Sequence, residues 1–522
     1  MKIAIPQLNY KINDIEGNSH KIIEAVKKAR QAGAELIVFP ELAISGALPQ
    51  DLLEREEFIN ACRLAIEQIA LQCTGIAAII GGPNLDVSNG IMYNSAYFIR
   101  DGEVVDGVHK NILSDYDLLN ESRYFIAGED NTPIRYKNQN IRIIFDEYEA
   151  EFIENTDSFV ILLGMAPFTT ESQSERHRTL STLSAKYGKN IIAVNHIGGH
   201  TSVLFDGNSS VYNYKGKLVA RLRDFEEDFQ IIDTHTLGAT TPIASTPVNK
   251  IALTHRALCF GIREYFSKHG FSKAILGLSG GIDSAVVAAL AAEALGAKNV
   301  MGILMPSQYS TDHSVRDAEE LAKHIGMPYT TIAIKDIYDQ YLNALQPLFE
   351  GCPFNVAEEN LQARTRGILV MAMSNKFGYI ALNTSNKSEA AVGYGTLYGD
   401  LCGSLSIIGD LYKTEVYELA RYINREQEII PENTMTKAPS AELRPNQKDQ
   451  DSLPEYAQLD SILKLYIEDN LSEKAICAQG YPEDTVKKVI GMLNRNDYKR
   501  AQCPPILKIS RKAFGSGRRY PY

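Results

Sequence analysis

The sequence predicts an α/β protein built from at least two domains. Three observations support this: the length of 522 residues, an alternation of apolar strands and amphipathic helices up to about residue 235, and a second α/β pattern that begins near residue 251. Between them, the Thr- and Pro-rich segment 236–250 lacks strong periodicity and predicts a linker. We therefore expect one domain at 1–235 and another at 251–522.

In the first domain, short apolar runs predict strands, and apolar residues spaced three and four apart predict helices. Because strands and helices alternate, we expect a layered α/β structure. The expected helices are 21–32 and 58–72, and the expected strands are 2–7, 35–41, 76–83, 95–100, 141–145, 159–164 and 191–195.

In the second domain, the segment 274–285 reads AILGLSGGIDSA, which predicts a buried strand, a glycine turn and the start of a helix. Gly280 and Gly281 let the backbone approach a ligand, and the free N–H groups at the helix start attract an anion. Asp283 would repel a bare phosphate, so we expect a Mg²⁺ ion between them. A helix is expected at 286–296, another at 314–326, and further helices after about residue 463.

Composition restricts the function. Hydrophobic residues make up 44% and charged residues 22% of the chain, which is typical of a folded globular protein. The net charge of −11 argues against a nucleic-acid binder, although basic residues crowd the last two dozen positions and could cover an anionic ligand. The seven cysteines show no zinc spacing, and no run of 18 apolar residues occurs. We expect a soluble cytoplasmic protein with reduced thiols and no membrane contact.

The motif SGGIDS at 279–284 resembles the signature of the ATP pyrophosphatases, which cleave ATP between the α and β phosphates to adenylate a substrate. The resemblance implies a Rossmann-like domain. GMP, asparagine, argininosuccinate and NAD synthetases and tRNA-thiolating enzymes share the motif. The ATP-binding residues that it implies are Gly277, Leu278, Ser279, Gly280, Gly281, Ile282, Asp283 and Ser284.

Further segments resemble the NAD synthetases specifically: ENLQARTR at 359–366, LNTSNKSE at 382–389, GYGTLYGD at 393–400 and LYKT at 411–414. A polar, proline-broken stretch at 437–451 resembles the loop that closes over the substrates in that family. The implied ATP ligands are Thr384, Lys413 and Ser440, the implied ligands of the deamido dinucleotide are Asn360, Arg364, Glu389 and Lys499, the implied Mg²⁺ ligands are Asp283 and Glu389, and the implied catalytic residues are Lys413 and Asp283.

The resemblance implies a carbon–nitrogen ligase with ATP as co-substrate. The carboxylate of nicotinic acid adenine dinucleotide (deamido-NAD) attacks the α-phosphate of ATP and releases pyrophosphate, and ammonia then displaces AMP to give NAD+. The family also implies a homo-oligomer.

The first domain resembles the nitrilase-like glutaminase domain of glutamine-dependent NAD synthetases, an α-β-β-α sandwich whose chemistry uses a Glu, a Lys and a nucleophilic Cys. FPELAISG at 39–46 matches the Glu motif and gives Glu41, and HKNILSDY at 109–116 matches the Lys motif and gives Lys110 and Tyr116. The third motif departs from the family, because Phe145 stands where the Cys belongs. A phenyl ring cannot attack a carboxamide.

Two further positions depart from the family pattern. Ala166 stands where a glutamine-contacting Ser belongs, and the run 198–202 reads GGHTS instead of a polar, acidic sequence. We therefore expect a vestigial glutaminase, with ammonia that is free or comes from a residual tunnel or a separate partner. The alternatives are an active glutaminase with a non-standard site, another ATP-pyrophosphatase amidotransferase, and a non-catalytic dinucleotide sensor.

Overall fold

The protein divides into two compact units, Met1–Val248 and Asn249–Tyr522, which we call the N-terminal and C-terminal units. The computed structural model describes residues 1–200, 202–244, 248–515 and 517–520. The predicted linker 236–250 spans the division, and its residues 245–247 lie outside the described residues.

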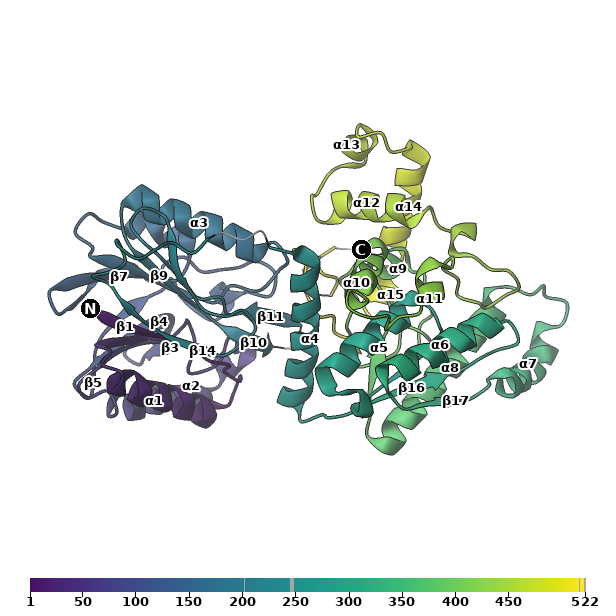
Figure 1. Cartoon of the computed structure of the whole chain (residues 1–522), viewed down its shortest axis with the longest axis horizontal. Helices are drawn as coiled ribbons and strands as arrows, with labels where there is room; N and C mark the ends of the chain where they lie inside the picture. The colour runs from purple at the N-terminus through teal and green to yellow at the C-terminus, as the bar shows by residue number, and fades with distance from the viewer. Residues whose placement is uncertain (201, 245–247, 516, 521–522) are drawn as a thin grey trace. The chain divides into compact units, whose positions relative to one another are not determined.

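The N-terminal unit contains two six-stranded sheets with helices on their outer faces (Figure 1). The first sheet has the order β14-β1-β2-β3-β4-β5 and the second β13-β12-β9-β8-β7-β6, while β10 and β11 form a separate pair. The strands of the first sheet are β1 (Lys2–Gln7), β2 (Leu36–Val38), β3 (Ala77–Asp86), β4 (Ile91–Arg100), β5 (Glu103–His109) and β14 (Asp228–Asp233). The other strands are β6 (Ile134–Tyr136), β7 (Gln139–Ile144), β8 (Phe159–Gly164), β9 (Ile191–Asn195), β10 (Ile197–His200), β11 (Val203–Asp206), β12 (Ser210–Tyr212) and β13 (Leu218–Arg221).

The alternation of side chains along the strands explains this layering. Successive residues of a strand point to opposite faces of the sheet. Ile3 and Val38 of the first sheet share a buried core with Ile143 and Leu163 of the second, so the two sheets pack face to face.

The outer faces of both sheets are covered by helices. The first sheet shares a second core with α1 (Ile15–Gln31) and α2 (Glu56–Ala70), and the second sheet packs against α3 (Ser172–Tyr187). The result is the α-β-β-α sandwich expected from the sequence (Figure 1).

The C-terminal unit is built on a parallel sheet with the order β17-β16-β15-β18-β19. From β15 the chain first adds β16 and β17 on one side and then β18 and β19 on the other, so the strand order reverses beside β15. In open parallel sheets, ligands bind at the carboxyl ends of the strands at such a point. The strands are β15 (Ala274–Gly277), β16 (Val300–Leu304), β17 (Tyr329–Thr331), β18 (Ile380–Asn383) and β19 (Leu405–Ser406).

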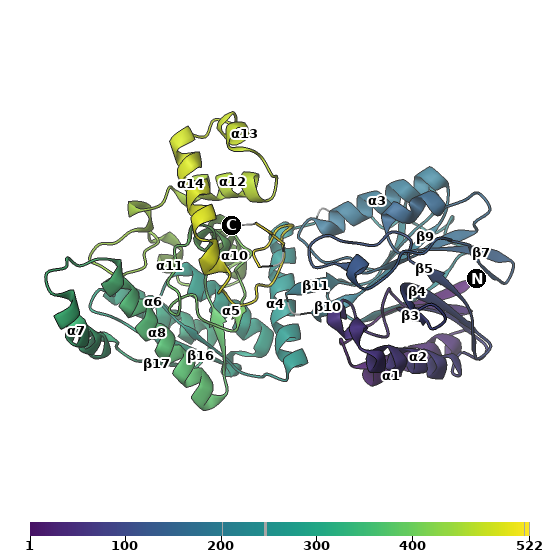
Figure 2. The ribbon, with the colours of Figure 1, turned by 180° about the vertical axis from the view of Figure 1, so that it is seen from behind.

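Helices surround this sheet. The helices α12, α13 and α14 lie beside one another in both Figure 1 and Figure 2, and they share an apolar core with Ala391, Val392 and Tyr412. The longer helices are α4 (Lys250–His269), α5 (Ile282–Leu295), α6 (Asp312–Ile325), α7 (Lys335–Phe349), α8 (Val356–Phe377), α10 (Lys413–Ile423), α12 (Tyr456–Ile467) and α14 (Glu483–Arg495). The short ones are α9 (Lys387–Val392), α11 (Glu432–Thr436), α13 (Glu473–Cys477) and α15 (Asp497–Arg500).

The element boundaries differ from the sequence-based expectations in places. The strands expected at 159–164 and 191–195 coincide with β8 and β9. The helix expected from residue 286 begins four residues earlier, at Ile282, because the polar residues of its first turn interrupt the apolar pattern. The short strands β5, β6 and β10 to β14 were not predicted, since three to seven residues carry little periodicity. Among the described residues, no helix has both the length and the apolar character needed to cross a bilayer.

Candidate active sites

The glycine turn predicted to be a phosphate cradle lies between β15 and α5. Gly281 is the N-cap of α5, and its N–H donates to the Ser279 Oγ at 3.1 Å. Gly280 has φ +76°, and a Cβ atom there would lie 2.2 Å from the carbonyl oxygen of Ser314. Only glycine fits this position, so the close approach of the turn to α6 depends on it.

Two carboxylates and one ammonium meet beside this cradle. Lys413, the first residue of α10, places its Nζ 2.5 Å from an Asp283 carboxylate oxygen and 3.0 Å from a Glu389 one. The Asn386 amide donates to the other Asp283 oxygen at 2.8 Å. The sequence places these residues far apart, and α5, α9 and α10 bring them together.

Burial and charge set the protonation of this cluster. Burial raises the pKa of Glu389 to about 8, with Lys413 opposing the shift and Asp283 adding to it. Burial alone would lower the pKa of Lys413, but the two carboxylates reverse this and hold it above its usual value. Two carboxylates that face one cavity are the hard oxygen ligands that Mg²⁺ prefers, so Asp283 and Glu389 fit the predicted metal.

A cavity of about 760 Å³ adjoins the cluster at the carboxyl ends of the strands. Asn360 lies in its wall and accepts a hydrogen bond from the Thr396 hydroxyl at 2.7 Å. Lys499 also lines it and donates to the carbonyl oxygens of Gly393 and Gly395, both at 2.8 Å. The predicted residues in its wall are Gly277, Leu278, Ser279, Gly281, Ile282, Asp283, Ser284, Asn360, Thr384, Glu389, Lys413, Ser440 and Lys499.

The two arginines of the ENLQARTR segment have different positions. Arg364 is not among the residues that line this cavity, and its Nε donates to the carbonyl oxygen of Leu397 at 3.2 Å. Arg366 does line the cavity, and its Nε donates to the carbonyl oxygen of Met305 at 3.1 Å. Burial lowers the pKa of Arg366 to about 10. Substrate binding by Arg364 stays a prediction, whereas Arg366 was missed although it lies two residues further on.

The 437–451 loop crosses the cavity, and three consecutive residues anchor it. The Glu442 carboxylate accepts hydrogen bonds from the Thr311 and Ser314 hydroxyls at 2.9 and 2.8 Å, at the start of α6. The carbonyl oxygen of Leu443 accepts one from the buried Gln362 amide at 2.9 Å. Glu442 adopts φ +49°, an unfavourable value for a residue other than glycine, so these contacts hold it against local strain.

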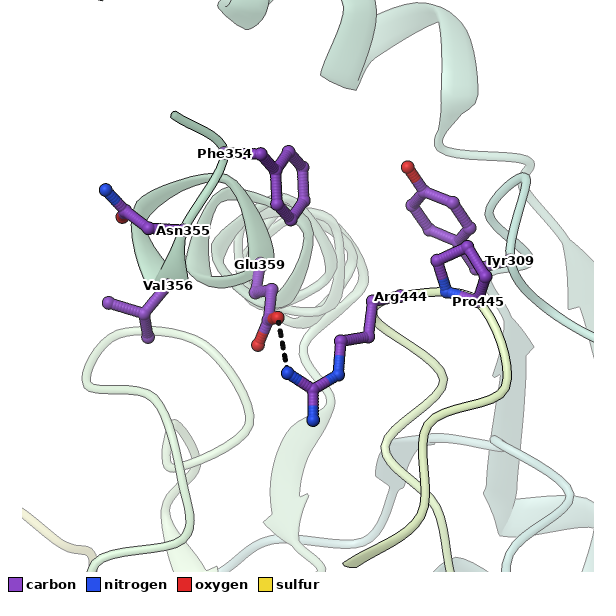
Figure 3. Close-up of a pocket in the computed structure, with 7 residues that line it drawn as sticks. All are labelled: Tyr309, Phe354, Asn355, Val356, Glu359, Arg444 and Pro445. Atoms are coloured by element: carbon purple, nitrogen blue, oxygen red, sulfur yellow. Dashed lines mark ion pairs between the residues drawn. The ribbon is translucent and has the colours of Figure 1, made fainter. Parts of the chain in front are cut away.

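The third anchor borders a second pocket, of about 510 Å³ (Figure 3). Arg444 of the loop lies 3.7 Å from the Glu359 carboxylate of α8. Figure 3 shows this ion pair. The start of α8 and Phe354, which precedes that helix, lie on one side of it, and Tyr309 lies on the other. Arg444, Glu359 and Tyr309 line both pockets, so the two pockets are adjacent.

In the N-terminal unit, Glu41 and Lys110 form a buried cluster. The Lys110 Nζ lies 2.8 Å from a Glu41 oxygen and 2.8 Å from a Glu121 oxygen, and all three side chains are less than 6% exposed. The Asn94 amide donates to both carboxylates, at 2.6 and 3.0 Å. Burial raises the pKa of Glu41 well above its usual range, although the ammonium of Lys110 opposes the shift.

Phe145 follows β7 at the position expected for the nucleophile. Its ring is 3% exposed and belongs to the apolar core between the two sheets. Its backbone N–H donates to the Glu149 carboxylate at 2.8 Å, and the Glu149 side chain also accepts from the N–H groups of Asn111 and Ile112. The backbone at 145 is therefore held firmly, and its side chain is a packing residue.

The remaining predicted positions of this site come from other segments of the N-terminal unit. The Ala166 N–H donates to the Asn195 side chain at 3.1 Å, and Tyr116 is 54% exposed. In the 198–202 run, Gly198 to His200 belong to β10, while Thr201 lies outside the described residues.

No cysteine of the N-terminal unit offers a ready replacement nucleophile. Cys62 and Cys73 are fully buried in the core that α1 and α2 share with the first sheet. Burial raises the pKa of each thiol to about 12. Both are therefore protonated at neutral pH, and a protonated thiol is a poor nucleophile.

Two family models match the chain, one for each unit. A carbon–nitrogen hydrolase model matches residues 2–241, and an NAD synthase model matches residues 254–503. These matches fall on the sandwich with the Glu41–Lys110 cluster and on the parallel sheet with the phosphate cradle. Together they define a two-part enzyme of the carbon–nitrogen ligase class.

Known proteins share this architecture over their whole length. The glutamine-dependent NAD(+) synthetase of Synechocystis is 41% identical over 99% of this chain and 98% of its own, and that of Thermotoga maritima is 36% identical over 100% and 98%. The solved glutamine-dependent NAD+ synthetase of Acinetobacter baumannii, in complex with ADP, is 36% identical, covers 100% of this chain and 98% of its own, and has a TM-score of 0.80. The chain therefore belongs to the glutamine-dependent NAD+ synthetase family, which confirms the family and the fold predicted from the sequence.

Removing the ammonium of Lys110 should destabilise the N-terminal unit. Lys110→Met leaves Glu41 and Glu121 as buried carboxylates without a cation, and we expect a loss of about 3 kcal/mol of unfolding free energy. Urea denaturation, followed by the fluorescence of the tyrosines, measures it. Lys137→Met, which breaks an exposed pair with Glu35, is the control and should cost less than about 1 kcal/mol. Equal losses in both variants would contradict the role of Lys110.

Glu442→Ala should release the 437–451 loop. Hydrogen bonds to a charged group contribute about 1.5 kcal/mol, so we expect amide hydrogen exchange in the loop to become about tenfold faster. Mass spectrometry of peptides from the loop measures this rate. Glu426→Ala, at an exposed carboxylate outside the loop, should leave the rate unchanged. If the two variants exchange equally fast, Glu442 does not anchor the loop.

Proposed function

We propose that this enzyme makes NAD+ from deamido-NAD with Mg-ATP and takes its nitrogen from ammonia, not from glutamine hydrolysed in its own N-terminal unit. The observation that carries the synthetic part is the convergence of the glycine cradle, Asp283, Glu389 and Lys413 on one cavity. The relative from A. baumannii was solved with ADP, which supports a nucleotide in this cavity.

The residues of the cavity divide the work of the first step. The N–H groups of the cradle and the ammonium of Lys413 neutralise charge on the phosphates as the deamido-NAD carboxylate attacks the α-phosphorus and pyrophosphate leaves. Mg²⁺, held by Asp283 and Glu389, would supply further positive charge there. Little covalent chemistry is asked of the protein, because positioning and electrostatics lower the barrier.

The second step needs a dry site. Ammonia attacks the acyl carbon of the adenylate, the bond to AMP breaks, and the surplus proton is lost to give the amide. Water would hydrolyse the same intermediate. Residues of the 437–451 loop line the cavity, and Glu442 and Arg444 anchor the loop there. This placement supports a role for the loop as the lid that excludes water.

The missing thiol supports ammonia as the nitrogen source. Glutamine hydrolysis in a nitrilase-type site needs a nucleophile that forms an acyl intermediate, and Phe145 is a buried ring. Ala166 also removes a hydroxyl from the expected glutamine site. The ammonia would be free ammonium or come from a separate source.

A second candidate is glutamine hydrolysis through a non-standard nucleophile. The intact arrangement of Glu41, Lys110 and Glu121 favours it, because these residues would still serve as base and electrostatic partners. The relatives are also named as glutamine-dependent. It would need a nucleophile other than Cys62 or Cys73, whose thiols are buried and protonated.

The nitrogen source can be measured directly. The purified enzyme receives deamido-NAD, Mg-ATP, unlabelled ammonium and glutamine with a ¹⁵N-labelled amide, and mass spectrometry reads the label in NAD+. We expect unlabelled NAD+ and no glutamate above the blank. Phe145→Cys alone should not restore the label, since Ala166 and the 198–202 run also differ. Labelled NAD+ from the unmodified protein would overturn the ammonia proposal while leaving NAD+ synthesis in place.

The synthetic site is tested in the same assay with saturating ammonium. Lys413→Met removes the ammonium that faces the phosphates, and we expect kcat to fall about 100-fold. Lys335→Met, which breaks an exposed ion pair with Asp339 on α7 away from the cavity, is the control and should leave kcat unchanged. An unchanged kcat in Lys413→Met would remove this lysine from the mechanism.

A further inference from the structure

A cluster of three ligand-type side chains lies between α4 and α5. His255 and Cys259 stand four residues apart on α4, so they share one face of that helix. Glu293 reaches them from the last turns of α5, against which α4 packs. Among the residues that the structure describes, they form a group of three His, Cys and carboxylate side chains close enough to bind one metal ion, with ligand atoms all within 4.8 Å of one another.

We propose that His255, Cys259 and Glu293 form a binding site for a divalent transition metal of the zinc class, which links α4 to α5. An imidazole nitrogen, a thiolate and a carboxylate oxygen are ligands that zinc accepts together. In a tetrahedral site with metal–ligand bonds of about 2.0 to 2.3 Å, the ligand atoms lie about 3 to 4 Å apart. The three ligand atoms would therefore have to move only slightly closer together.

Hydrogen-bonding contacts connect these three side chains, and a metal ion could replace the shared protons. The His255 Nε2 lies 3.1 Å from a Glu293 oxygen, and the Cys259 thiol also interacts with that carboxylate. The Leu290 carbonyl oxygen lies 4.0 Å from the Cys259 sulfur, at the limit for a hydrogen bond to sulfur. The Leu290 carbonyl is therefore only a weak partner of the thiol and would compete little with a metal ion.

Charge and access both suit a divalent ion. A neutral imidazole, a thiolate and a carboxylate carry a total charge of −2, which a divalent cation balances. His255 and Cys259 are 4% and 2% exposed, whereas the side chain of Glu293 is 56% exposed. The ion can enter along Glu293, and the fourth position can be filled by water. Tyr422, whose ring centroid lies 5.3 Å from that of His255, packs beside the imidazole.

This site is separate from the predicted Mg²⁺ site. Glu293 follows Asp283 by ten residues on α5, which corresponds to about 15 Å along the helix. The ligands also differ, because the site at Asp283 and Glu389 offers only oxygen atoms. The proposal therefore stands or falls independently of NAD+ synthesis, which provides a separate measure of correct folding.

Cobalt(II) titration tests the site. The full-length protein, without a polyhistidine tag and stripped with EDTA, is titrated with Co²⁺ in the absence of nucleotides. We expect visible d–d bands and a near-ultraviolet sulfur-to-cobalt band that saturate at one equivalent and disappear when Zn²⁺ is added. Zn²⁺ should also raise the melting temperature, because it binds the folded state.

Variants assign the ligands. Cys259→Ser should abolish the sulfur-to-cobalt band, and His255→Gln should keep the band but weaken binding at least about tenfold. Cys73→Ser, at a buried thiol of the N-terminal unit that lies outside the cluster, is the matched control and should keep both. NAD+ synthesis with Mg²⁺ checks that each variant is folded.

The proposal is overturned if the unmodified protein shows no sulfur-to-cobalt band at one equivalent, or if the band survives in Cys259→Ser. If Cys259→Ser does not fold, the titrations of the unmodified protein and of His255→Gln test the proposal instead. Equal affinity in His255→Gln and the unmodified protein would then exclude the site.

Discussion

Buried lysines, each shared by two carboxylates, organise the polar interior of both units. Removing a lone ammonium or carboxylate from water costs several kcal/mol, so each member of such a set is stable only while the others are present. The three sets consist of Lys110 with Glu41 and Glu121, Lys387 with Asp410 and Glu468, and Lys413 with Asp283 and Glu389. Segments that are distant in sequence are thereby fixed to one another at the places where chemistry or tight packing requires it.

The sets differ in how many N–H donors of each ammonium are engaged by groups of the protein. An ammonium has three N–H donors, and those of Lys387 are taken up by Asp410, Glu468 and the Ser510 hydroxyl. This lysine is fully enclosed and ties the C-terminal segment to α9. Lys413 has the same type of partners but faces the cavity, so it can also meet a ligand. The same electrostatic arrangement thus serves structure in one place and a binding site in another.

The sequence predicted the parts of the site that depend on short contiguous segments. The glycine turn was indicated by its own residues, whereas Thr384, Glu389 and Lys413 were implied by the resemblance of their segments to the NAD synthetases. Arg366 and Glu442 were not predicted. Which arginine of α8 faces the cavity depends on the exact rotation of that helix, and Glu442 reaches α6 through a positive φ angle in an irregular loop. Neither property leaves a periodic pattern in the sequence. The short strands of the N-terminal unit escaped prediction for the same reason.

The same energetics explain why Glu41 and Lys110 remain in a site for which we propose that glutamine hydrolysis is lost. Position 145 borders the apolar core between the sheets, where an aromatic ring adds buried surface, so replacing a thiol there carries little energetic penalty. Replacing Lys110 instead leaves two carboxylates buried without a cation, and the whole unit loses stability. Under the proposed loss of glutamine hydrolysis, the Glu and Lys motifs persist because the buried charges stabilise the fold.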